Sequence, residues 1–398
     1  MKKVLLVIAM LAAPGLSAIA QGTWSQKANF PGAGKVFPTG FSIGAKGYLG
    51  TGKDTSCFSN DFWEFDPSTN IWTQKASVPG PKRMLACGFS IGDKGYIGLG
   101  VDSTYTCLKD FWEYDPNTNV WTQKADFAGG IRSSVASFCI NNKGYISTGF
   151  AIFNGNVFAN DLWEFDPSTD IWVRKADFPA AGRSESICFS IGNKGYVGTG
   201  FNDGFLDDFW EWDQTTNLWT QKTNFGGGPI CDAAGFSICS KGFVCTGENP
   251  GEMFSNALWE YFPDTNIWVQ QLNFGGIARD ESLGITINNK GYVGFGGEMM
   301  PLNDLWEYTP EIPCSESLAE IYFESDFQIY PNPATNTLTI ETPSPSTIEI
   351  STIQGQPIKT FASSSAKTNV DVSALPCGIY IVEVKTEKGV GVKKFIKE

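Results

Sequence analysis

Five basic side chains recur at one fixed place in the sequence and could together bind an anion. Each lies twelve positions before the glycine of a Lys-Gly pair. If the six copies of this pattern meet around one axis, the cationic groups would form a ring for a carboxylate or a sulfate. The basic residues are Lys35, Arg83, Arg132, Arg183 and Arg279, and the remaining copy has Ile230 instead.

The same basic residues could instead stabilise the fold. Every copy also has a glutamate directly after a tryptophan and between bulky apolar residues, where a half-buried carboxylate needs a partner. An ion pair between the basic residue and this glutamate would meet that need, and the copy with Ile230 would do without it. The glutamates are Glu64, Glu113, Glu164, Glu211, Glu260 and Glu307.

The composition excludes several kinds of chemistry. The 398 residues include no histidine, so nucleophile pairs that need imidazole and sites that bind copper or zinc through His are absent. A formal net charge of −13 argues against a nucleic-acid partner. No metal or other cofactor is expected, because the repeated Asn-Asp pairs, such as Asn60-Asp61, are interpreted as turn caps rather than calcium ligands.

Three short patterns repeat six times and must position these residues. Lys-Gly-aromatic recurs at intervals of 47 to 51 residues, and a Trp-Glu pair and a second tryptophan keep step with it. Such a period indicates one structural unit per repeat. The second tryptophans are Trp24, Trp72, Trp121, Trp172, Trp219 and Trp268.

Each repeat is predicted to form four antiparallel strands. In the first repeat, segments 41–43 and 48–50 flank a glycine-containing turn, and segments 62–65 and 71–74 flank Asp66-Pro67-Ser68-Thr69-Asn70. No segment has a sustained helical period. The chain starts with only the last strand of a repeat, near Trp24, and the sixth repeat ends after its third, near Trp306. Pairing these two strands would remove the open edges, so an all-β, six-bladed β-propeller closed by an N-terminal strand is predicted for residues 21–310.

These repeats resemble the kelch family, whose propellers include the central domain of galactose oxidase. The resemblance rests on Gly50-Thr51-Gly52, Gly296-Gly297, the aromatic residue after Lys-Gly and the tryptophan of the fourth strand, over residues 22–310. It implies the fold and not the copper chemistry, because the copper site of galactose oxidase needs His ligands.

The expected function is binding of a glycan or a protein by one loop face of the propeller. Aromatic residues in the loops of that face could stack on sugars or contact a protein, although they could also cap the blade edges; they include Phe153, Phe158 and Phe205. The alternative is a carbohydrate-active enzyme of the epimerase or mutarotase type that works through Arg and Glu. Its acid/base candidates lie beside the basic residues, at Glu185, Asp232, Asp280 and Glu281. Whether the chain is an enzyme is left open.

The N-terminus has the pattern of a secretory signal peptide over residues 1–20, with Lys2 and Lys3, an apolar run and Ala18-Ile19-Ala20. No later segment is long and apolar enough to be expected to span a membrane, and a monomer is expected. Export permits disulfides, but the spacing of the ten cysteines does not define their pairing.

The repeats stop after residue 310, and a polar linker is predicted over 311–326. Alternating short strands over 327–398 predict a small immunoglobulin-like β-sandwich. This tail resembles the type A C-terminal sorting domain of the type IX secretion system in Tyr330-Pro331-Asn332-Pro333-Ala334, Leu375-Pro376-Cys377-Gly378-Ile379-Tyr380 and Lys393-Lys394-Phe395. The resemblance implies the secretion machinery as partner, and a secreted or cell-surface location in a Gram-negative bacterium. A glycan-binding sandwich is the alternative.

Overall fold

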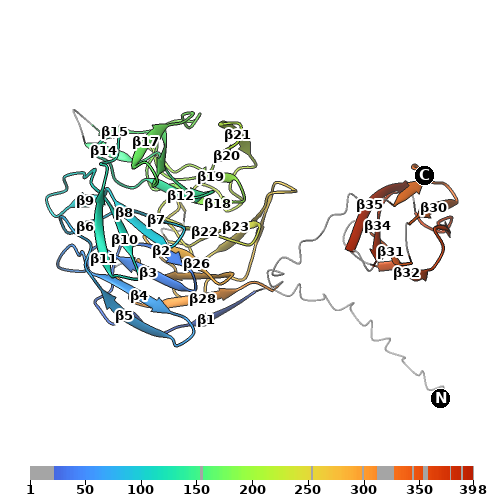
Figure 1. Ribbon diagram of the computed structural model, residues 1–398, viewed down its shortest axis with the longest axis horizontal. Coiled ribbons are helices and arrows are strands. Elements are labelled where there is room, and N and C mark those ends of the chain that lie inside the picture. Colours follow the sequence, from blue (N-terminus) through green and yellow to red (C-terminus); the bar gives the residue numbers. More distant parts are fainter. Residues whose placement is uncertain are drawn as a thin grey trace, which may run out of the picture. The chain divides into compact units, whose positions relative to one another are not determined.

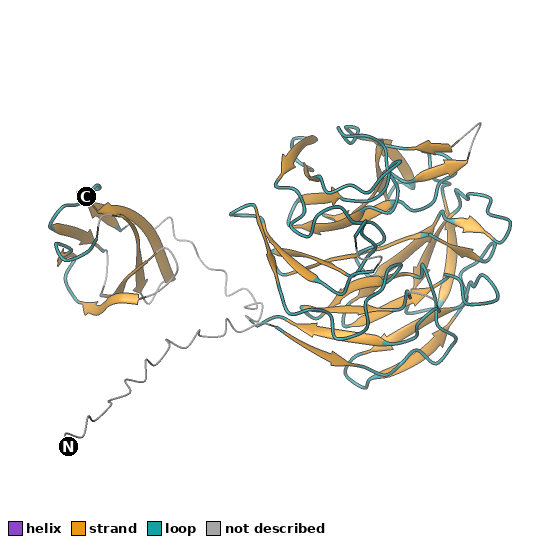
Figure 2. Ribbon diagram, turned by 180° about the vertical axis from the view of Figure 1, so that it is seen from behind, coloured by secondary structure: helices purple, strands orange, loops and turns teal. Residues whose placement is uncertain are grey.

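The computed structural model describes residues 22–152, 156–251, 254–297, 300–311, 327–342, 345–352, 357–376, 378–386 and 389–397. The chain divides into two compact units, Met1–Pro313 and Cys314–Glu398. Within the described ranges all regular elements are β-strands (Figures 1 and 2), and no helix has the length and hydrophobicity that a membrane crossing needs. The predicted signal peptide and nearly all of the predicted linker lie outside these ranges.

Six four-stranded antiparallel sheets build the first unit, and we number them along the chain. Sheet one has β2 (Thr39–Ile43), β3 (Lys46–Gly50), β4 (Phe62–Asp66) and β5 (Ile71–Lys75). Sheet two has β7 (Cys87–Ile91), β8 (Lys94–Gly98), β10 (Phe111–Asp115) and β11 (Val120–Lys124). Sheet three has β12 (Ala136–Ile140), β13 (Lys143–Ser147), β16 (Leu162–Asp166) and β17 (Ile171–Arg174). Sheet four has β18 (Ile187–Ile191), β19 (Lys194–Gly198), β20 (Phe209–Asp213) and β21 (Leu218–Lys222).

Sheet five has β22 (Ala234–Ile238), β23 (Lys241–Cys245), β24 (Leu258–Phe262) and β25 (Ile267–Gln270). Sheet six has β26 (Leu283–Ile287), β27 (Lys290–Gly294) and β28 (Leu305–Thr309), and its fourth strand is β1 (Thr23–Gln26) from the start of the chain. Two short ribbons lie in the loops, β6 (Arg83–Met84) with β9 (Val101–Asp102) and β14 (Phe150–Ile152) with β15 (Asn156–Phe158).

The sheets surround a common axis. The first strands β2, β7, β12, β18, β22 and β26 contact one another in that order, and β26 contacts β2. β1 pairs antiparallel with β28, with Trp24 opposite Tyr308. The result is an all-β, propeller-like arrangement whose first strands face the axis and whose fourth strands lie outermost.

Hydrophobic cores lie between neighbouring sheets and explain the Lys-Gly glycine. Phe89 and Phe111 of sheet two, for example, share a core with Phe165 and Trp172 of sheet three. A Cβ atom on Gly95 would stand 2.0 Å from the ring of Phe41 in the preceding sheet. Only glycine therefore permits the sheets to approach this closely.

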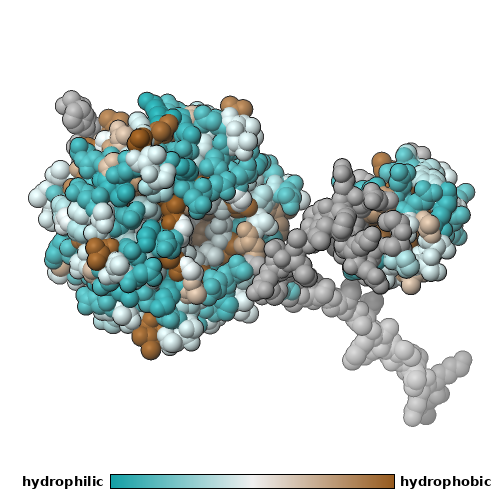
Figure 3. All heavy atoms as spheres, viewed as in Figure 1, coloured by the Kyte–Doolittle hydropathy of each residue, from teal (hydrophilic) through white to brown (hydrophobic). Residues whose placement is uncertain are grey.

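Exposed apolar residues are spread around the outside of this unit. The first residue of the fourth strand is apolar and exposed in five sheets, at Ile71, Val120, Ile171, Leu218 and Ile267. In the view of Figure 3 the unit's surface is mostly hydrophilic, with separate hydrophobic spots. Single apolar residues of this kind are normal on protein surfaces and do not mark an interface.

The second unit contains two sheets around one core. One sheet has the order β29 (Gln328–Tyr330), β30 (Thr337–Glu341) and β33 (Lys367–Asp371), and the other has β32 (Pro357–Ser363), β31 (Ser346–Thr352), β34 (Gly378–Thr386) and β35 (Gly389–Lys397). Leu338 and Ile340 from the first sheet pack in the same core as Ile348, Val382 and Phe395 from the second. Alternate residues of β30, β31 and β34 face this core, as the sequence pattern predicts.

Candidate functional site

The five basic residues are buried and form ion pairs with aspartates. Arg83 donates through Nη1 and Nη2 to the two carboxylate oxygens of Asp110, at 2.7 and 2.6 Å, and Nη1 also donates to the carbonyl of Leu99 at 3.1 Å. Its side chain is fully buried. The equivalent pairs are Lys35–Asp61, Arg132–Asp161, Arg183–Asp208 and Arg279–Asp304.

The partner predicted from the sequence for these basic residues is wrong. Their partner is the aspartate that precedes the third strand, which had been interpreted as a turn cap, and not the glutamate inside that strand. The third strand pairs with the second so that Glu64 lies opposite Tyr48, and Glu64 is bound there by Tyr48 Oη at 2.9 Å and Lys46 Nζ at 2.6 Å. Buried, bidentate ion pairs favour a structural role for the arginines, and their contact with a ligand stays a prediction.

The predicted loop aromatics pack against neighbouring rings. Phe158 lies 5.3 Å from Phe150 in the β14–β15 ribbon, and Phe205 lies edge-on to Phe201 at 5.6 Å, measured between ring centroids. Phe158 and Phe205 are half-buried, and Phe153 lies outside the described residues. These contacts of Phe158 and Phe205 fit loop capping, and contact of the three residues with a ligand stays a prediction.

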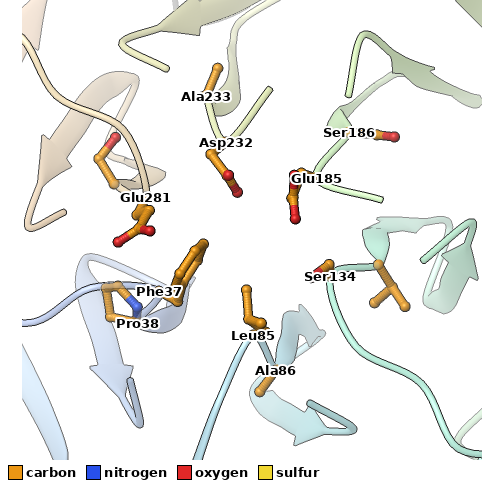
Figure 4. Close-up of a pocket in the computed structure, with 12 residues that line it drawn as sticks. Phe37, Pro38, Leu85, Ala86, Ser134, Glu185, Ser186, Asp232, Ala233 and Glu281 are labelled. Carbon is orange, nitrogen blue, oxygen red and sulfur yellow. The ribbon is translucent and has the colours of Figure 1, made fainter. Parts of the chain in front are cut away.

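A ring of six equivalent residues lines the axial opening, two positions after the basic residues (Figure 4). Each has a left-handed backbone, with φ between 50° and 57°, which is costly for residues other than glycine. The backbone N–H of Glu281 donates to the carbonyl of Asp232 at 3.0 Å, and that of Phe37 donates to Glu281 at 3.2 Å. We call these residues the mouth ring: Phe37, Leu85, Ser134, Glu185, Asp232 and Glu281.

The mouth ring is acidic on one side and uncharged on the other. Glu185, Asp232 and Glu281 are consecutive in the ring, and Phe37, Leu85 and Ser134 complete it. The opening between them has a volume of about 130 Å³, which is below the roughly 300 Å³ of ordinary small-molecule pockets. It is therefore a shallow mouth with an apolar side and a carboxyl side.

Burial and mutual repulsion make these carboxyl groups weak acids. Burial, with the charges of Asp280 and Glu185, raises the pKa of Glu281 to about 8. Burial raises the pKa of Asp280 to about 6, and burial followed by neighbouring carboxylates raises the pKa of Asp232 and of Glu185. Glu281 therefore holds its proton at neutral pH, and its carboxyl group can donate a hydrogen bond as well as accept one.

One part of this group has the ligand types of a metal site. Glu185, Cys231 and Asp232 offer ligand atoms that all lie within 4.8 Å of one another. Burial and the nearby carboxylates raise the pKa of the Cys231 thiol, so a cation would have to displace protons before binding.

Three mouth-ring residues, Glu185, Asp232 and Glu281, and their neighbour Asp280 were predicted from the sequence as acid/base candidates. The other three, Phe37, Leu85 and Ser134, were not predicted, and Cys231 was given no site role. The signal was available as a fixed offset, because each mouth-ring residue follows the repeated basic position, or Ile230, by two residues. What it did not supply was the convergence of six loops on one axis.

Changing Glu281 to Gln is expected to stabilise the protein at pH 8 and to have little effect at pH 4. The folded-state pKa lies above the usual 4.5, so folding favours the protonated carboxyl, and stability is lost as pH rises from about 4.5 to 8. An amide imitates the protonated group and cannot ionise. We expect a gain of about 1–3 kcal/mol at pH 8, measured by urea unfolding. The exposed Asp264→Asn variant is the control, and an equal gain at both pH values would contradict the prediction.

Comparisons with known proteins identify the second unit. Residues 328–398 match the family model of the secretion system C-terminal sorting domain. The tail is a type IX sorting domain. It indicates export and a secreted or cell-surface location, in Bacteroidetes-type bacteria, and interaction with the secretion machinery.

For the rest of the chain the comparisons show the fold alone. A solved structure titled "Structure of YjhT" is similar with a TM-score of 0.61 and 18% sequence identity, over 70% of this chain and 95% of that one. This similarity supports a β-propeller-like fold for the first unit. No curated protein matches the chain.

Proposed function

We propose that this protein is a six-bladed kelch-type β-propeller, exported by the type IX system, that binds a glycan or a protein ligand at its mouth ring. The pairing of β1 with β28 and the contact of β26 with β2 support closure of the six sheets into a ring. The sorting domain supports delivery to the cell surface or the medium. The proposed ligand binding rests on the mouth ring.

The observation that carries this proposal is the loss of sixfold symmetry at the mouth ring. The buried ion pair recurs in five sheets, and the left-handed backbone recurs in all six. These repeated features stabilise the fold. The side chains at the mouth ring differ from sheet to sheet, although their backbone conformation is the same. The fold therefore does not dictate these side chains, and binding of a ligand can account for their identities.

The chemistry of the mouth defines the ligand it would take. Protonated carboxyl groups on one side can exchange hydrogen bonds with hydroxyl or amide groups, and deprotonated ones can bind a cation. Phe37 and Leu85 offer apolar contact on the other side. A sugar at the end of a glycan, or a polar side chain on a protein loop, presents both surfaces.

A binding screen of glycans and host-surface proteins against the whole chain tests this proposal. The triple variant Glu185→Gln, Asp232→Asn and Glu281→Gln keeps side-chain shape but removes ionisation and the hydroxyl donors. We expect it to weaken binding of the ligand found by at least about tenfold. The control Asp93→Asn/Asp264→Asn removes exposed carboxylates elsewhere and should bind normally. Unchanged binding by the triple variant would move the ligand away from the mouth ring.

A second candidate function is acid/base catalysis on a sugar, of the epimerase or mutarotase type. The raised pKa of Glu281, about 8, favours it, because a general acid or base works best near the ambient pH. Against it, the five basic residues that were expected to assist are buried in ion pairs. Anomeric exchange of free sugars, measured by NMR with wild type and Glu281→Gln, separates the two functions, since only an enzyme would accelerate exchange and lose that effect in the variant.

A further inference from the structure

Sheet five departs from the other sheets at both ends of the buried ion pair. Ile230 stands where the others have a basic residue, and Ala257 stands where they have its aspartate. The environment of the pair is otherwise kept, because Phe225 contacts Trp259 as Phe274 contacts Trp306. Because both charged side chains of the pair are missing, sheet five has no unpaired buried charge at this position.

A pocket occupies the space of the missing pair. Its volume is about 380 Å³, within the roughly 300–1,000 Å³ range of small-molecule pockets. Phe225, Ile230 and Val244 form apolar walls, and Thr246, Ser255 and Gln270 add polar groups. None of the lining residues that the structure describes is charged.

The pocket also contains a hydrogen-bond donor that the missing pair leaves without a partner. In the other five sheets the indole Nε1–H of the equivalent tryptophan donates to the aspartate, at 2.7–3.1 Å. Ala257 offers no acceptor to Trp259, and no hydrogen bond of its indole is found within the described part of the chain. In sheet four the guanidinium also donates to the carbonyl of Thr199, and the equivalent carbonyl, on Thr246, has no guanidinium to accept from.

We propose that this pocket in sheet five is a second binding site, which takes one neutral sugar unit. Among the described lining residues a charged ligand would find no counter-charge. A purely apolar ligand would leave the indole N–H and the polar side chains of the wall unsatisfied. A sugar hydroxyl both accepts and donates, so it can serve the Trp259 N–H and the Thr246 carbonyl, while the carbon face of the ring lies against the apolar wall.

The indole N–H signals of the whole, ¹⁵N-labelled chain provide the test. The probes are D-glucose, D-galactose, D-mannose and N-acetyl-D-glucosamine, and Trp259→Phe assigns the signal. We expect at least one sugar to shift the Trp259 signal with a dissociation constant in the millimolar range. Five tryptophans are internal controls, because their indoles are bound to aspartate; they are Trp63, Trp112, Trp163, Trp210 and Trp306.

The double variant Ile230→Arg/Ala257→Asp fills the pocket with the ion pair that the other sheets contain. It is expected to remain folded and to weaken the sugar response by at least about tenfold, while ligand binding at the mouth ring is unchanged. No shift with any of the four sugars, or a shift that survives in the filled variant, overturns the proposal. A response to n-butanol without a response to sugars would identify an apolar pocket and overturn it as well.

Discussion

Replacing Arg83 with isoleucine alone is expected to destabilise the first unit by about 3–5 kcal/mol, the cost of leaving one partner of a buried ion pair uncompensated. Arg83 is fully buried and supplies two of the hydrogen bonds to the carboxylate of Asp110. Burial alone would raise the pKa of Asp110, yet the hydrogen bonds and charge of Arg83 hold it below its usual value. Urea unfolding followed by tryptophan fluorescence measures the loss.

The matched variant Arg83→Ile/Asp110→Ala copies the pair of residues that sheet five already has, Ile230 and Ala257. It should recover most of the lost stability, because no unpaired charge remains. The coupling between the two positions is then the difference between the double variant and the two single variants. A double variant as unstable as the sum of the single ones would show that the two side chains do not act as a pair.

The repeats and strands could be predicted because their signals are local. The strand segments predicted around Phe62 and Ile71 are observed as β4 and β5, since alternating apolar residues and turn residues act within a few positions. The partner of the arginines could not be found in that way. Asp110 is 27 residues from Arg83, and the pairing depends on how the loops fold back on the sheet.

The sequence nevertheless contained a signal for this ion pair that comparison of the repeats would have shown. The one repeat without a basic residue, at Ile230, is also the one that has alanine in place of aspartate, at Ala257. Two changes in the same repeat indicate that the residues touch. The raised pKa of Glu281 in the mouth ring could not be predicted from the repeats, because the burial that raises it exists only when six loops converge on one axis.

Deleting residues 327–398 is expected to abolish delivery to the cell surface and the medium. The deletion removes the whole segment that matches the sorting domain, and the exported chain would then accumulate in the periplasm. The effect should be nearly complete, because the sorting domain is the part of the chain that the secretion machinery recognises. Fractionation of cells, with antibody detection of the first unit, measures the distribution.

Misfolding of the truncated chain has to be separated from loss of sorting. The described core residues of the second unit, from Phe327 to Phe395, form one hydrophobic cluster, and the first unit is a compact unit by itself. The truncated chain should therefore keep the unfolding midpoint and tryptophan emission of the first unit. A folded but undelivered protein would establish the tail as the export signal, whereas normal surface delivery of the truncated chain would leave the tail as an accessory sandwich, with glycan binding as its remaining candidate role.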